Sequence, residues 1–150
     1  MPFQHTTGFT NKNKGFTLVE MLIVTIMLSL LLSLALPSYK AVVRKARRAE
    51  ALETLYRIQI AQEKWRSTHT AYASLADLGI PATTPSGNYT ISVTLPVSPG
   101  DQTAYTASAT AVAGTSQELD KAGSTSCATL TINQDEPVYS PAAQAACWGK

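Results

Sequence analysis

The sequence contains few charged residues, few histidines and few cysteines, and each shortage limits the classes of function that the protein can have. Charged residues make up 15% of the 150 residues, well below the roughly 25% of an ordinary soluble domain. The two cysteines cannot form a zinc site alone, and neither lies in a Cys-x-x-Cys pair. No Gly-x-Ser-x-Gly, phosphate-binding loop or His-Glu-x-x-His motif occurs. The length allows one domain with an appendage and excludes a multidomain enzyme.

The shortage of charge is local, because residues 16–36 (FTLVEMLIVTIMLSLLLSLAL) carry only one ionisable side chain, Glu20. As a helix this segment spans roughly 30 Å, the thickness of a bilayer's hydrocarbon core. It therefore predicts a membrane-inserted helix. A carboxylate at the centre of such a helix costs on the order of 2.5–3.5 kcal/mol, and less near an end. Either Glu20 snorkels or is protonated, or it pairs with a cation supplied later.

Helical spacing continues beyond the apolar segment. No Gly or Pro occurs between Ser38 and Ala76, and Pro37 kinks a helix without necessarily ending it. We therefore predict one helix from Phe16 to Ser67, roughly 80 Å long. Its second half is amphipathic, and the predicted apolar face comprises residues at steps of three and four, namely Val42, Ala46, Ala49, Leu52, Tyr56 and Ile60.

The remainder of the chain has the composition of a small β-sheet domain. From Thr68 onward Thr, Ser, Ala, Gly and Pro dominate. Apolar and small side chains alternate with polar ones in residues 89–95, 105–111 and 128–132, which predicts three strands joined by loops. The strands suggest an antiparallel meander, covered on one face by the apolar stripe of the helix. The predicted fold class is α+β.

These features resemble those of the type IV pilin family, which includes pilus subunits and type II secretion pseudopilins. Residues 14–20 (KGFTLVE) are similar to a prepilin processing site. In that family a membrane aspartyl peptidase cuts after the glycine, here between Gly15 and Phe16, and the new amino terminus, here Phe16, is N-methylated. The family's glutamate falls at Glu20, and its proline falls at Pro37 in Ala-Leu-Pro-Ser-Tyr.

The resemblance implies an organisation, a location and partners. It implies a prepilin leader at 1–15, a transmembrane and filament-core helix at 16–36, an amphipathic helix at 37–67 and a globular β-sheet head at 68–150. The protein is expected in the bacterial inner membrane, single-pass with its head in the periplasm, and in an extracellular pilus after assembly. Its partners are expected to be other pilin subunits in a helical filament, the prepilin peptidase/N-methyltransferase and the inner-membrane pilus assembly machinery.

A charge argument gives Glu20 a role in that assembly. Cleavage before the apolar run leaves a positive amine on Phe16. Between staggered subunits this amine and the Glu20 carboxylate can pair in a low-dielectric bundle, where an unpaired charge costs several kcal/mol. We predict that Glu20 sets the register of assembly and that Pro37 permits local flexing.

Cys127 and Cys147 predict a disulfide in an exported domain, which closes a loop of about 21 residues and stabilises it by roughly 3 kcal/mol on the chain-entropy model. The carboxyl-terminal part resembles minor pilins of the PilE type, in Cys127-x-x-Leu130 and in Cys147-Trp148. Residues 135–137 (Asp-Glu-Pro) depart from that family, in which a glycine turn is usual.

Residues 44–48 (RKARR) invite a nucleic-acid interpretation, but no aromatic residues are interleaved with them, and we favour a solvated or headgroup-facing collar. Because these basic residues follow the apolar segment, the positive-inside rule alone favours a cytoplasmic carboxyl end. The leader match and the cysteines favour the opposite orientation, which we adopt.

Three alternatives to a minor pilin remain. A secretion pseudopilin shares the amino-terminal half. Cleavage after Ala35, at the small-x-small site Ser33-Leu34-Ala35, releases a soluble secreted binding domain. A DNA-uptake pilin uses residues 44–48 or the head, although nothing in the sequence requires DNA as a partner.

No catalytic constellation is visible. His5 lies in the expected leader, so that His69 is the remaining histidine, and we expect it to be a capping or surface residue rather than a general base. Asp77 and Asp101 are isolated in predicted loops. We predict that the protein is not an enzyme and uses no cofactor or metal.

Overall fold

The structure, a computed structural model, describes residues 15–96 and 103–150. The chain divides into two compact units, an amino-terminal unit (1–38) and a globular unit (39–150). One helix, α1 (Leu18–Arg66), belongs to both, and Pro37 lies inside it. The predicted helix from Phe16 to Ser67 is thus confirmed to within two residues at either end.

A four-stranded antiparallel sheet forms the centre of the globular unit, in the order β1-β2-β5-β6. The three predicted strands are confirmed as β1, β2 and β5, and Ala109 of β2 stands opposite Ile91 of β1 and Leu130 of β5. The bounds are β1 (Tyr89–Thr94), β2 (Thr106–Ala111), β5 (Thr129–Asn133) and β6 (Pro137–Val138).

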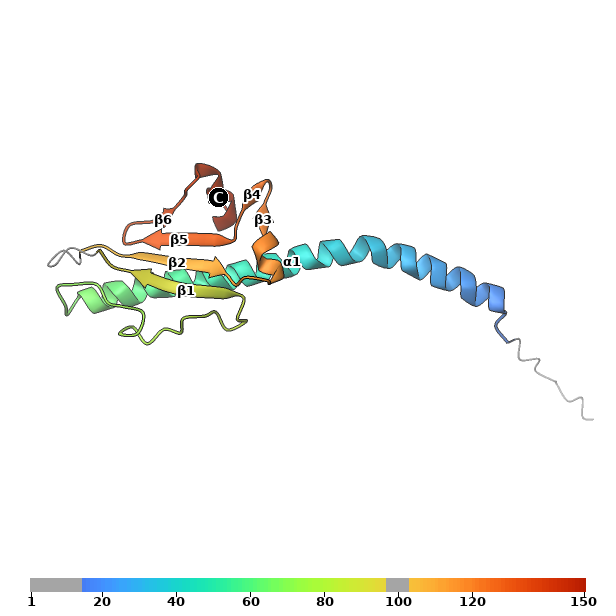
Figure 1. Ribbon diagram of the computed structural model, residues 1–150, viewed down its shortest axis with the longest axis horizontal. Coiled ribbons are helices and arrows are strands. Elements are labelled where there is room, and N and C mark those ends of the chain that lie inside the picture. Colours follow the sequence, from blue (N-terminus) through green and yellow to red (C-terminus); the bar gives the residue numbers. More distant parts are fainter. Residues whose placement is uncertain (1–14, 97–102) are drawn as a thin grey trace, which may run out of the picture. The chain divides into compact units, whose positions relative to one another are not determined.

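Five short elements were not predicted, and β6 is one of them. Between β2 and β5 the chain forms the 3-10 helix η1 (Ser116–Leu119) and a separate hairpin of β3 (Lys121–Ala122) with β4 (Thr125–Ser126). After β6 comes a second 3-10 helix, η2 (Ala142–Trp148). The meander is therefore interrupted by an excursion of the chain that leaves the sheet after β2 and returns as β5 (Figure 1).

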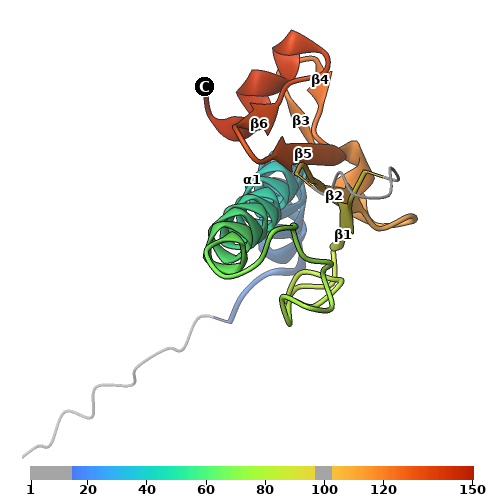
Figure 2. The ribbon, with the colours of Figure 1, turned by 90° about the vertical axis from the view of Figure 1, so that its left-hand side faces the viewer.

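Residues 39–66 of α1 lie against one face of the sheet (Figure 2). The core joins fully buried Leu55 and Ile58 of the helix to fully buried Ala107 and Ala109 of β2. Small side chains on a central strand leave room for the larger ones of the helix, which is how facing layers reach native packing density. Helix-on-sheet packing in an α+β fold is confirmed.

The face of α1 that packs on the sheet is only partly the predicted one, since Leu52 of the predicted face packs against the core but most of that face does not. Val42 and Ile60 of the predicted face are 65% and 71% exposed, and Tyr56 is 41% exposed. Half of the residues that are buried on α1 are polar, and for this reason a pattern of apolar residues alone points to the wrong face. The buried residues are Arg48, Ala51, Thr54, Leu55, Ile58 and Gln62.

The carboxyl-terminal segment is held by the predicted disulfide between Cys127 and Cys147, whose Cα atoms are 5.6 Å apart. It brings Trp148, 8% exposed, edge-on to Tyr56 at 5.7 Å between ring centroids. The turn between β5 and β6 contains no glycine. Instead Oδ1 of Asn133 accepts hydrogen bonds from two successive backbone N–H groups of the turn, each at 2.9 Å.

Candidate functional site

The expected processing site lies at the start of α1. Phe16 is 75% exposed, and Thr17 caps the helix because its Oγ1 accepts a hydrogen bond from the N–H of Glu20 at 3.2 Å. The carboxylate of Glu20 makes no hydrogen bond or ion pair with any residue that the structure describes. Gly15 precedes the helix, and the rest of the expected leader falls outside the described residues.

No residue in the described ranges 15–96 and 103–150 covers the apolar segment. Every residue from Phe16 to Leu36 is exposed, and by length and composition the helix is able to cross a membrane. Its hydroxyl groups are already satisfied, since Thr25, Ser29 and Ser33 each donate to a carbonyl of the preceding turn at 2.7–2.9 Å. A helix whose polar groups bond internally suits an environment without water.

A buried ion pair joins α1 to the excursion between β2 and β5. Nη1 of Arg48 lies 3.1 Å from Oδ2 of Asp120 and 3.0 Å from Sγ of Cys127. Arg48 and Asp120 are only 7% and 3% exposed. Burial raises the pKa of Asp120, and the neighbouring Arg48 and Arg44 oppose that rise. Arg48 therefore does not belong to the solvated or headgroup-facing collar expected for residues 44–48, and this corrects that expectation for Arg48 alone.

A glutamine network lies beside this pair. Gln117 of η1 donates from Nε2 to the hydroxyl of Tyr89 at 2.9 Å and to the carbonyl oxygen of Arg44 at 3.0 Å. The Tyr89 hydroxyl in turn donates to the carbonyl oxygen of Cys127 at 3.3 Å. Burial raises the pKa of Tyr89 to about 12. These contacts fasten η1 to the helix, a role for Gln117 and Asp120 that no sequence pattern indicated.

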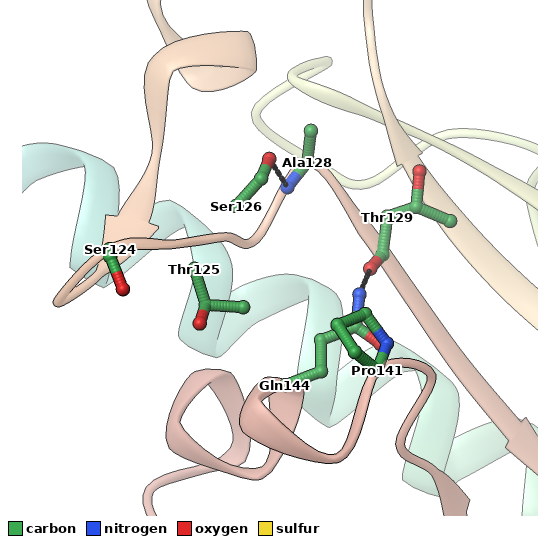
Figure 3. A pocket seen from close by; sticks show the side chains of 7 residues that line it. All are labelled: Ser124, Thr125, Ser126, Ala128, Thr129, Pro141 and Gln144. Atoms are coloured by element: carbon green, nitrogen blue, oxygen red, sulfur yellow. Dashed lines mark hydrogen bonds between the residues drawn. The ribbon is translucent and has the colours of Figure 1, made fainter.

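A hollow of about 520 Å³ lies between the β4 region and η2 (Figure 3). Hydroxyl groups of Ser124, Thr125, Ser126 and Thr129 line it, together with Gln144. The amide of Gln144 donates to the backbone oxygen of Thr129 at 2.7 Å. None of its lining residues is ionisable. The hollow offers hydrogen bonds but no general acid, base or nucleophile pair.

Two family models match the chain. One, described as type IV minor pilin ComP, DNA uptake sequence receptor, matches residues 37–131, which is more than half of the chain. The chain belongs to this family of type IV minor pilins. The other, the prokaryotic N-terminal methylation motif, matches residues 8–36. No curated protein sequence matches the chain.

The membership confirms the resemblance seen in the sequence and the function predicted from it. The protein is a type IV pilus minor pilin, a membrane-anchored subunit that is processed by prepilin peptidase and assembles with other pilins. The pseudopilin and the soluble secreted domain gain no support.

His69 and Asp77 of this minor pilin, which the sequence showed as isolated titratable residues, make contacts typical of structural residues. His69 stacks on Trp65, with ring centroids 3.9 Å apart, and its Nδ1 lies 3.1 Å from the carbonyl oxygen of Trp65. It is exposed at the end of α1, as predicted. Asp77 accepts hydrogen bonds from the N–H and hydroxyl of Ser74, which lower its pKa. Asp101 lies outside the described residues.

Within residues 15–96 and 103–150 no three His, Cys, Asp or Glu side chains cluster in a way that suits a metal ion. The statement that this minor pilin is not an enzyme and takes no cofactor stays a prediction.

Proposed function

We propose that this minor pilin is cut between Gly15 and Phe16, methylated on Phe16, and held in the inner membrane by residues 16–36 with the globular unit in the periplasm. It then enters the pilus through the same helix, by way of the inner-membrane assembly machinery. The observation that carries the proposal is the complete exposure of the apolar segment. Such a surface has to be covered by lipid or by neighbouring subunits.

Glu20 supplies the polar contact in that assembly. Its carboxylate is unbonded within the described residues and lies in the first turn of α1, four residues from the new amine on Phe16. Once lipid or neighbouring helices surround this turn, an unpaired carboxylate costs several kcal/mol. The amine of an adjacent subunit removes that cost, and only one axial stagger of the two helices brings the charges together.

Processing is tested by the intact mass and amino-terminal residue of the protein from its native membrane fraction. We expect a chain that begins at Phe16 and carries one extra methyl group. A chain that begins at Leu36 would overturn both the membrane anchor and the role of Glu20.

Assembly is tested by Glu20→Gln, with Glu53→Gln as the matched control, since Glu53 is an exposed carboxylate farther along α1. Both variants are expected to be cut and to remain in the membrane. Glu20→Gln is expected to enter sheared filaments at least about tenfold less than the control, because loss of a buried pair exceeds about 1.4 kcal/mol. Equal incorporation of the two variants would contradict the pairing.

The family is described as a DNA uptake sequence receptor, which favours a second function, binding of DNA by the globular unit. The surface that suits it best is the β3–β4 hairpin with the hollow of Figure 3. Hydroxyl and amide groups there are donors of the kind that contact DNA phosphates. Lys121 stands opposite Ser126 in the hairpin and adds a cation, whereas Arg48 is committed to Asp120.

DNA binding is tested by fluorescence anisotropy of a labelled duplex with the full chain in detergent. Lys121→Gln is expected to weaken binding and to reduce the slope of log affinity against log salt by about 0.9. Lys64→Gln, an exposed charge on α1, is the control and is expected to leave the slope unchanged. Absence of binding at low salt, or equal effects of both variants, would refute this second function.

A further inference from the structure

A second hollow, of about 330 Å³, lies at the start of the globular unit between α1 and η1. Lys40, Arg44 and Arg47 line it from the helix, at steps of four and three that place them on one face. Ser116 and Leu119 line it from η1. Nη1 of Arg47 donates to Oγ of Ser116 at 3.3 Å, which draws the guanidinium toward the wall formed by η1.

The hollow carries uncompensated positive charge. Lys40, Arg44 and Arg47 form no ion pair within the described residues. The carboxylate that interacts with Arg44 is Asp120, and it is already bonded to Arg48. Glu118, the acid within η1, accepts a hydrogen bond from the N–H of Gly114 at 3.0 Å and does not line the hollow.

Apolar and aromatic side chains line the same hollow. Tyr39 and Leu119 are each 68% exposed, although both are large. An exposed tyrosine and an exposed leucine beside three cations form a surface that is both apolar and positive. Aromatic residues and long basic side chains are enriched together where proteins meet the headgroups of a bilayer.

The position of these three cations along the chain indicates which anion lies near them. Lys40, Arg44 and Arg47 follow Leu36, the end of the apolar segment, by four, eight and eleven residues. At the helical rise these positions fall roughly 6, 12 and 17 Å beyond that end, while a headgroup layer is roughly 5–8 Å deep. Helical side chains lean toward the amino terminus, and long basic ones extend several ångströms, so all three cations reach back toward the headgroups.

We propose that this hollow binds the phosphate of an anionic phospholipid headgroup, such as that of phosphatidylglycerol, in the leaflet from which the globular unit emerges. Lys40, Arg44 and Arg47 take the phosphate oxygens, the Ser116 hydroxyl donates a further hydrogen bond, and Leu119 enters the interfacial layer. The proposal rests on the proposed membrane helix at 16–36. Its consequence is a subunit whose globular unit is docked on the bilayer before assembly, and extraction into the pilus has to break that contact.

Duplex DNA is the less favoured ligand for this hollow. Its cations lie next to the segment that enters the bilayer, and a duplex would have to approach along a surface that itself carries negative headgroups. The β3–β4 hairpin surface has no such neighbour in the sequence. The lipid and the duplex thus predict different sensitive residues, which an experiment can separate.

The test is lipid retention by the full chain in mild detergent, read by native mass spectrometry after incubation with equal amounts of phosphatidylglycerol and phosphatidylcholine. We expect one phosphatidylglycerol bound in preference to phosphatidylcholine. Arg44→Gln combined with Arg47→Gln is expected to lower that preference about 30-fold. Arg57→Gln combined with Lys64→Gln removes the same charge more than a Debye length farther along α1, and is expected to change nothing.

Three further measurements, on a single variant and with two competing ligands, test the lipid assignment. Arg47→Gln alone keeps Arg44 beside Asp120, and a partial loss of preference in a variant with native circular dichroism excludes misfolding as the cause. Inorganic phosphate at millimolar concentration is expected not to displace the lipid. Displacement by free phosphate, displacement by duplex DNA, or equal losses in the pocket and control variants would each overturn the lipid assignment.

The same samples separate this inference from the proposed function. If the wild-type chain reconstitutes into bilayer nanodiscs but shows no preference between the two lipids, the headgroup site is wrong and the membrane helix stands. If the chain does not reconstitute into nanodiscs at all, the membrane helix is wrong and the headgroup site is wrong with it.

Discussion

Replacing Arg48 by methionine tests whether a buried ion pair holds the excursion between β2 and β5 to the helix. Methionine keeps the unbranched, apolar part of the arginine side chain and removes its charge. Asp120, 3% exposed, then loses its ion-pair partner, and Cys127 loses the contact of its sulfur with the guanidinium. The variant therefore leaves the Asp120 carboxylate buried without a counter-charge.

The expected loss follows from the geometry. At 3.1 Å and an effective dielectric constant of about 20, two unit charges attract by about 5 kcal/mol. Removing one partner of such a buried pair costs about 3–5 kcal/mol. Replacing both partners, as Arg48→Met with Asp120→Asn, is expected to recover most of that loss, because no uncompensated charge then remains.

The loss is also expected to depend on pH, with a definite sign. Burial raises the pKa of Asp120 above its unfolded value, so the native state binds more protons and the contribution of Asp120 to stability falls as pH rises through that pKa. Arg48 opposes the rise, and removing it moves the pKa of Asp120 further upward. The loss of stability in Arg48→Met is therefore expected to be smallest near about pH 4 and largest at neutral pH.

Urea unfolding of the full chain in detergent measures this loss, with fluorescence of the buried Trp148 as the reporter. Arg57→Met removes an exposed arginine from the same helix and is expected to change the free energy of unfolding by less than about 0.5 kcal/mol. A loss below about 1 kcal/mol at neutral pH for Arg48→Met, or one that does not change with pH, would refute the reasoning from burial.

Three other outcomes are expected, two in the same unfolding assay and one in an ultraviolet titration of tyrosine. Replacing Cys127 and Cys147 by alanine is expected to lower the free energy of unfolding by about 3 kcal/mol, and the oxidised wild-type chain is the reference. Gln62→Leu leaves the N–H and the carbonyl of Ala73 without their partners at 2.9 and 2.8 Å, at an expected cost of about 2–4 kcal/mol. Because burial raises the pKa of Tyr89 to about 12, ultraviolet titration is expected to show this tyrosine un-ionised at pH 10, and its contribution to stability is lost only as pH rises toward that value.

The long elements were predictable because the pattern of apolar and polar residues repeats several times within each of them. Residues 89–95 and 105–111 alternate over seven positions each, and six of the seven form β1 and β2. The two-residue strands β3, β4 and β6 are too short to show any period. Other contacts hold the chain around them, namely the Asn133 cap of the turn before β6 and the disulfide, which joins residues 20 apart in the sequence.

The buried face of α1 was not predictable from apolar periodicity. An apolar pattern treats Arg48 and Gln62 as solvent-facing residues, yet both are buried because hydrogen-bond partners outside the helix satisfy them. Asp120 is 72 residues from Arg48, and nothing in the sequence marks it out among the six acids of residues 67–150. Apolar residues at helical spacing usually mark the buried face of a helix. This rule fails where buried polar residues have hydrogen-bond partners.

The function of the amino-terminal part of the chain is easier to predict from the sequence than that of the globular unit. The reason is that its motif consists of consecutive residues, whereas the contacts of the globular unit form only on folding. The proposed cleavage between Gly15 and Phe16 rests on a motif of consecutive residues, so it can be predicted from the sequence without knowledge of the fold. That motif is shared by pilins and pseudopilins, and it cannot separate them. Contacts in the globular unit, such as that of Arg48 with Asp120, join residues that only folding brings together. The family match over residues 37–131, which shows that the chain is a minor pilin, falls almost entirely within that unit.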